Sequence, residues 1–194
     1  YNDKNALAGG VVSNWTQWNS SRTQAMELWA EIDSYLHATD TSMLEGVSNF
    51  DHKTHLPILS ELHEDLIAIV HSTLFPHDDW LSWKGFEINA ITKQVRQKVL
   101  SYIKQCHSMN GFNVQMRKVV DDLIRYGNCF TQTYYKNESM ESEQGMVSGY
   151  AGPAIKRISP YDIAFNPVAR EFSKTPKIIR ELITVGDLHE LYTG

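Results

Sequence analysis

The segment RKVVDDLIRYGNCFTQTYY, residues 117–135, decides the fold class because the hydrophobic period changes inside it. Before Gly127, apolar residues recur at helical spacing, and a glycine in this place is typical of the left-handed residue that ends a helix. After it, residues 128–135 are rich in β-branched and aromatic side chains, which favour a strand. The segment therefore predicts a helix over about residues 113–126 that leads directly into a strand.

Three more amphipathic helices are predicted on the N-terminal side of this segment. They cover residues 22–38, a segment that starts near Pro57 and ends before Pro76, and residues 90–109. Residues 1–21 are polar and contain Gly9-Gly10, so we expect a flexible arm there. The apolar stripe predicted for the helix after Pro57 consists of Leu59, Leu62, Leu66, Ile69, Val70 and Leu74.

Short strands and turns are predicted on the C-terminal side. Residues 136–152 are polar and hold three glycines, which predicts a long hairpin loop or a mobile tip. The runs AIKRI and YDIAF predict two short strands around a turn at Ser159-Pro160, because proline forbids continuous pairing. Residues 176–183 predict another strand or a short helix, and we favour the strand because Thr184 then supplies a capping-box-like start for a helix at 185.

The order of these elements predicts an α+β fold. A helical part over residues 22–127 precedes a β-rich part over residues 128–194, in which we expect a small mixed sheet leading into a further helix. The chain has 194 residues, begins with Tyr1 and ends just after that helix begins, so we interpret it as a fragment of a larger subunit.

Composition narrows the classes of function. Apolar residues make up 42% of the chain, enough for a real core, and the net charge of −5 argues against a protein whose main task is to hold nucleic-acid phosphates. No apolar run approaches the roughly 20 residues that span a bilayer, so no membrane partner is expected.

A metal site is conceivable in the region 51–79, where histidines and aspartates cluster. This region could serve a metal-dependent hydrolase, which stays an alternative function. However, His63 and His71 are eight residues apart and no His-Glu-x-x-His motif is present. The run His77-Asp78-Asp79 follows Pro76 and favours a turn. Neither a Gly-x-Ser-x-Gly elbow nor a phosphate-binding loop occurs, so we expect no enzyme activity and no cofactor.

The opening segment and IKRISPYDIAFNPVAREFSKTPKIIRELITVGDL, residues 155–188, together resemble portal proteins of tailed bacteriophages. Members of that family often have a helix that ends in a Tyr-Gly-Asn-type turn, and later an Ile-Ser-Pro-x-Asp-Ile-x-Phe-Asn-Pro-like phrase. Residues 52–85, with His-x-Leu-Pro and Leu-Phe-Pro phrases, are similar to the region upstream. The resemblance extends over about residues 22–191.

The resemblance implies a structural role. Portals form a ring of about twelve subunits at one capsid vertex, in the virion, through which double-stranded DNA is packaged and ejected. The implied partners are further copies of the chain, the major capsid protein, the terminase and tail adaptor proteins. This chain would supply the wing-like α+β body, in which the Ser159-Pro160 phrase is scaffold. A monomeric virion adaptor module stays a second alternative.

A ring subunit needs interface residues, and aromatic density outside the helix stripes indicates where to look. We expect a candidate subunit interface at Trp80, Trp83 and Phe86, and at the first helix around Trp29.

Overall fold

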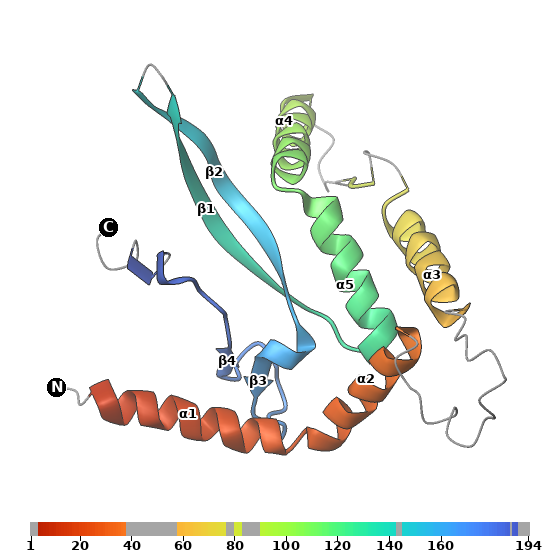
Figure 1. The fold of residues 1–194 in the computed structure, drawn as a ribbon. Coiled ribbons are helices and arrows are strands. Elements are labelled where there is room, and N and C mark those ends of the chain that lie inside the picture. The colour runs from red at the N-terminus through yellow and green to blue at the C-terminus, as the bar shows by residue number, and fades with distance from the viewer. Residues whose placement is uncertain are drawn as a thin grey trace. The chain divides into compact units, whose positions relative to one another are not determined.

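The structure is a computed structural model that describes residues 4–37, 58–76, 80–82, 90–142, 145–186 and 188–189. Among these described residues five α-helices precede four strands, so the predicted α+β class is confirmed. Their arrangement can be followed in Figure 1. The strands form two separate two-stranded antiparallel sheets, where we had expected one small mixed sheet. The chain divides into two compact units: residues 1–30 with 158–194, called the terminal unit, and residues 31–157, called the central unit.

The terminal unit begins with helix α1 (Lys4–Ser20), which corrects the expected flexible arm. Val11, Trp15 and Trp18 recur at helical spacing, both tryptophans are half-buried, and α1 packs against strand β3 (Ile163–Phe165). Two glycines inside a helix cost roughly 1 kcal/mol each relative to alanine. The contact with β3 offsets that cost. The helical spacing of Val11, Trp15 and Trp18 was overlooked in the sequence because the glycine pair favours a flexible segment.

The Ser159-Pro160 phrase lies at the centre of the terminal unit. Pro160–Asp162 forms a single 3-10 turn, and the hydroxyl of Ser159 accepts a hydrogen bond from the backbone N–H of Tyr161. Arg22, just before helix α2 (Thr23–Leu36), donates to the carbonyl oxygens of Pro160 at 2.6 Å and Tyr161 at 3.1 Å. These two hydrogen bonds hold the turn against the residue that precedes α2, within the terminal unit.

The two runs predicted on either side of this turn do belong to strands, but to different sheets. AIKRI is the end of strand β2 (Gly145–Ile158), whereas β3 pairs with strand β4 (Lys177–Ile179), with Ile163 opposite Ile179. The predicted strand at residues 176–183 is therefore confirmed over three residues. Beyond it, residues 185–186 and 188–189 are helical, and Leu188 N–H donates to Thr184 O at 3.0 Å.

The central unit is built around helix α5 (Phe112–Tyr126), which contacts both α3 (Ile58–Leu74) and α4 (Ala90–Met109) (Figure 1). Gly127 has a left-handed φ of 66° and donates its N–H to Leu123 O, so the predicted helix end is confirmed. The periodicity had placed α2, α3, α4 and α5 within one or two residues of their observed ends.

Strand β1 (Phe130–Ser142) pairs with β2 in a long two-stranded ribbon. The prediction of a long loop over residues 136–152 was therefore wrong, because both strands run through most of that segment. Polar residues and glycines have low strand propensity, but pairing with the neighbouring strand overrides it. Among the described residues, no helix is long and apolar enough to cross a membrane.

Candidate subunit interface

Trp29 was expected at an interface, and it lies in the core of the terminal unit. Its side chain is 7% exposed, and its ring meets the ring of Tyr161 edge to face, with centroids 5.4 Å apart. An edge-to-face pair of this kind is a favourable aromatic arrangement. Burial within one chain leaves little of Trp29 for contact with a second subunit, and we do not retain it as an interface residue.

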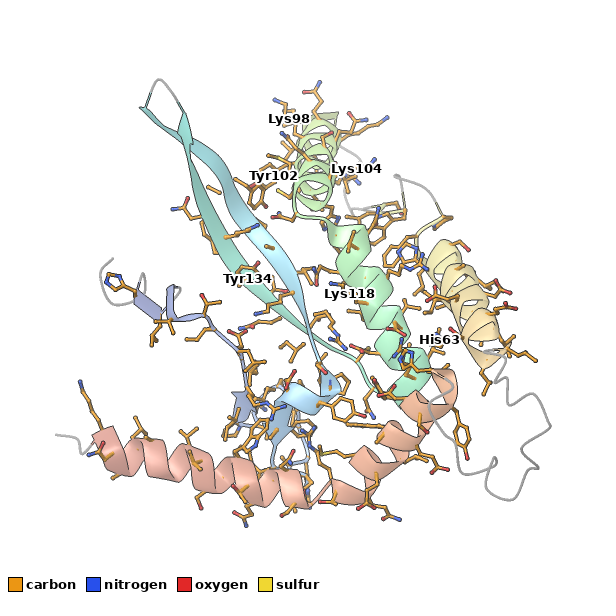
Figure 2. All side chains as sticks on the ribbon, in the orientation of Figure 1. His63, Lys98, Tyr102, Lys104, Lys118 and Tyr134 are labelled. Atoms are coloured by element: carbon orange, nitrogen blue, oxygen red, sulfur yellow. The ribbon has the colours of Figure 1, made fainter. Side chains whose placement is uncertain are left out.

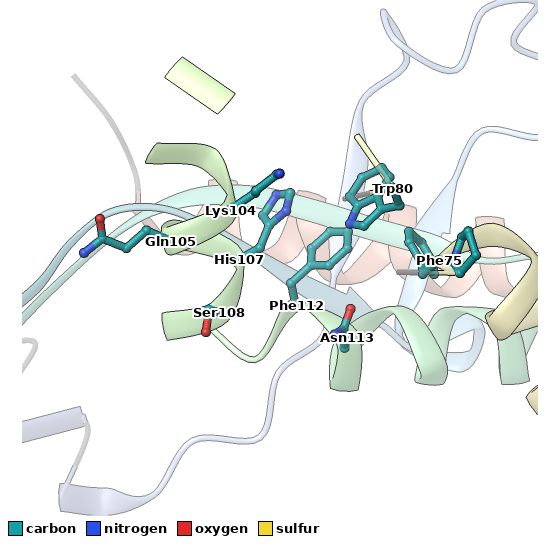
Figure 3. A pocket seen from close by; sticks show the side chains of 9 residues that line it. Phe75, Trp80, Lys104, Gln105, His107, Ser108, Phe112 and Asn113 are labelled. Carbon is teal, nitrogen blue, oxygen red and sulfur yellow. The ribbon is translucent and has the colours of Figure 1, made fainter. Parts of the chain in front are cut away.

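Trp80 is half-buried in an aromatic cluster of the central unit (Figure 3). Its ring is nearly parallel to that of Phe112, with centroids 5.6 Å apart, and perpendicular to that of Phe75 at 5.0 Å. The ring of His107 stacks on both Phe112 and Trp80, with its centroid 4.1 Å from that of Phe112 and 5.8 Å from that of Trp80. The cluster joins the end of α3 to the α4–α5 junction. Trp83 and Phe86, the other two expected interface residues, lie outside the described residues.

This aromatic cluster forms one wall of an open pocket of about 560 Å³. Besides Pro76, the rest of the lining is polar: Lys104, Gln105, Ser108 and Asn113, as Figure 3 shows. Within the described residues, the pocket places an aromatic wall next to amide, hydroxyl and ammonium groups, a lining that can hold a side chain of another molecule. Part of Trp80 therefore stays accessible where a second protein could contact it.

The aromatic surroundings of His107 predict a pH dependence of stability. Burial lowers the pKa of His107 from its usual value near 6.5, so the folded state favours the neutral ring. The unfolded state then binds more protons, and the free energy of unfolding should fall as the pH drops below about 6.5. Urea unfolding of the wild type and of His107→Gln at pH 7.5 and 5.5 should show a smaller fall in the variant. Equal falls in both proteins would mean that other groups cause the dependence.

Helix α3 exposes the apolar stripe that the sequence had suggested for its core. The residues buried beneath the helix are His63 and Ile67. Among the predicted stripe residues, Leu62 is 55% exposed and Leu66 is 42% exposed. The exposed apolar residues of α3 are Ile58, Leu59, Leu62, Leu66, Ile69 and Leu74. The helix itself was predicted correctly. However, α3 has apolar residues on both faces, and the face that is buried carries His63 and Ile67 and not the predicted stripe.

Helix α4 also leaves large apolar side chains exposed. Ile91, Val95, Tyr102 and Met109 are each more than half exposed, whereas Cys106 is buried. Figure 2 shows Tyr102 together with Lys98 and Lys104 on this helix. Single exposed apolar residues are normal on a protein surface. Continuous rows of them on two helices of one unit are typical of an interaction surface.

The histidine-rich region contributes structural contacts where it is described. The Nε2 atom of His63 lies 3.1 Å from an oxygen of Asp121, in a geometry short of a well-formed hydrogen bond. That oxygen accepts from Arg125 at 2.6 Å, and the hydroxyl of Tyr126 donates to Asp33 at 3.0 Å. These groups connect α2, α3 and α5.

Within the described ranges, no three histidine, cysteine, aspartate or glutamate side chains are grouped as metal ligands. The other members of the expected cluster lie outside those ranges: Asp51, His52, His55, His77, Asp78 and Asp79. Asp65 lies on an exposed part of α3.

A buried ion pair between Asp122 and Arg157 was not predicted from the sequence. Asp122 is 1% exposed, and both of its oxygens accept hydrogen bonds from the guanidinium of Arg157 on β2. The amide of Gln115 accepts from the backbone N–H of Arg157 at 3.1 Å. The two partners are 35 residues apart in the chain, so no local pattern indicates the pair. It fixes the end of the ribbon against α5.

Comparison with the models of known protein families gives no match for this chain. No curated protein matches it either.

Proposed function

We propose that this chain is the wing portion of a structural subunit of a ring-shaped viral portal, without enzymatic activity and without a cofactor. In this role it would stand at one capsid vertex of the virion, next to the major capsid protein. Its ring would serve as the conduit for packaging and ejection of double-stranded DNA, and as the platform for the terminase and the tail adaptor.

The observation that carries the proposal is the exposure of apolar side chains along both α3 and α4. Covering such stripes with another protein surface removes their apolar area from water, at roughly 25 cal/mol per Å². A subunit of a permanent assembly has this need, since such interfaces are more apolar than an ordinary surface. The resemblance of residues 22–191 to portal proteins supplies the kind of assembly.

The net charge of −5 supports the same function. DNA must slide through a portal, and a body rich in lysine and arginine would hold its phosphates through release of counterions. A monomeric adaptor would share this charge, so oligomeric state is the property that separates the two functions.

The test is negative-stain electron microscopy combined with light scattering on the purified protein. Closed rings with a central hole, and a mass many times the 22.2 kDa of this chain, are the expected result. A particle of monomer mass under all assembly conditions, or an open polymer with no closed form, would contradict the portal function. In that case metal content should be measured, because a stoichiometric metal ion would favour the hydrolase alternative.

A further inference from the structure

We propose that helix α3 of one copy of this chain docks on helix α4 of the next copy, so that the two exposed stripes cover each other. The inference deepens the proposed function and rests on it for one point, that the contacts close into a ring. The contact itself depends only on the two helices.

The α3 surface combines an apolar stripe with an acidic border. Leu59, Leu62, Leu66 and Ile69 recur at three- and four-residue spacing, so they lie along one side of the helix. By the same spacing Glu61 and Asp65 border that stripe on its far side from the buried residues His63 and Ile67. Glu64 is excluded from this border, because it already pairs with Arg117 at 2.6 Å.

The α4 surface has the matching composition. Ile91, Val95, Lys98 and Tyr102 follow each other at intervals of four, three and four residues, which places them on one side of the helix. Exposed polar residues, Gln94, Ser101 and Gln105, border them. Lys98 therefore stands within the stripe, where it can meet an acidic residue of a neighbour.

The charges that border the two stripes are complementary. On α3 they are the acidic residues Glu61 and Asp65, and α3 has no lysine or arginine. On α4 the charge within the stripe is Lys98, and α4 has no aspartate or glutamate. Opposite charges on two interacting surfaces steer association and fix its register, whereas α3 against α3 or α4 against α4 would place like charges together. Charge thus favours the contact of α3 with α4 over either symmetric one.

This pairing has a consequence for symmetry. Two different helices of the same unit form the two halves of the contact, so the interface is heterologous. A pair of copies therefore still has an uncovered α3 at one end and an uncovered α4 at the other. Repetition of such a contact gives a ring when the rotation closes. Their lengths also match, since helices of 17 and 20 residues differ by less than one turn.

A charge-swap experiment tests the contact. One variant is Glu61→Lys/Asp65→Lys on α3, and the other is Gln94→Glu/Lys98→Glu on α4. Each variant alone would place like charges across the contact, so we expect its self-association to weaken by roughly tenfold or more in sedimentation velocity. An equimolar mixture of the two variants, and the protein that combines all four changes, should regain the association of the wild type.

The control is Arg170→Glu/Lys174→Glu, which reverses two exposed charges of the terminal unit. It should associate as the wild type does. Full-strength association of each single variant, or a mixture that fails to recover, would overturn the α3–α4 contact. A wild type that stays monomeric at about 100 μM, where even a weak contact is populated, would also overturn it.

The two proposals fail in different ways. If rings form but the charge swaps have no effect on them, the contact is wrong and the portal function stands. If the swaps behave as expected but only open chains of subunits form, the contact stands and the portal function is contradicted.

Discussion

Replacement of Trp29 with alanine is expected to lower the free energy of unfolding by about 3–5 kcal/mol, the usual cost of truncating a buried tryptophan. The side chain is 7% exposed and packs edge to face with Tyr161, so its removal leaves a cavity between α2 and the 3-10 turn of the terminal unit. Urea unfolding followed by circular dichroism measures the loss. Trp29→Phe should cost less, because an aromatic ring is retained.

The control for this prediction is the neighbouring residue on the same helix. Leu28 is 55% exposed, and Leu28→Ala should change stability by no more than about 0.5 kcal/mol. The result also decides whether Trp29 belongs to the core or to a contact between copies. A Trp29→Ala variant that unfolds like the wild type but no longer self-associates would restore the interface that the sequence had suggested.

Asp122→Ala should be the second damaging change, with an expected loss of about 2–4 kcal/mol. Removing one partner of a buried ion pair leaves the other charge without compensation. The loss in unfolding free energy should be smaller than the largest losses known for broken buried ion pairs, for two reasons. Burial raises the pKa of Asp122, although hydrogen bonds from Arg157 pull it down, so part of the carboxylate's stabilisation is already offset. In addition, the Arg157 side chain is 29% exposed, so water can solvate it in part.

A matched pair in the same unit provides the control. Glu64 and Arg117 join helices α3 and α5 through the same kind of arginine–carboxylate contact, but both side chains are 57% exposed. Glu64→Ala should therefore cost at most about 1 kcal/mol. A double-mutant cycle with Arg157→Ala completes the test: the double variant should be more stable than the sum of the single losses predicts. Additive losses would mean that Asp122 and Arg157 act independently.

The helices of this protein were predictable where one apolar side dominates. In α5, the periodic stripe and Gly127 gave both the element and its end. In α1, Trp15 and Trp18 have the same helical spacing. However, Gly9-Gly10 and the polar residues of this segment led to the prediction of a flexible arm. The ribbon strands were underestimated, because residues 136–152 acquire their strand structure from pairing with each other.

The candidate site was less predictable than the fold, for a physical reason. Aromatic density pointed to Trp29 and Trp80, but whether an aromatic side chain is buried depends on the elements that pack over it. Helix α3 has leucines and isoleucines on more than one side, and its periodicity cannot decide which side is covered. His63 meets Asp121, 58 residues further along the chain, and Asp122 meets Arg157; such contacts exist only after the chain has folded.

The ribbon of β1 and β2 has one more consequence, for the behaviour of the protein in concentrated solution. Within the described residues each of the two strands pairs only with the other, and side chains satisfy some backbone groups of β2, such as the N–H of Arg157. The remaining unpaired edge groups could template a foreign strand. The sequence carries known deterrents against such templating: Lys136, Glu138 and Glu141 on β1, and Pro153 and Lys156 on β2. Proline has no N–H to offer, and charges oppose stacking of identical ribbons. Three of these residues, Lys136, Glu138 and Glu141, belong to the segment 136–152 for which a loop was predicted, so the charges that weakened the strand prediction are also ones expected to oppose aggregation.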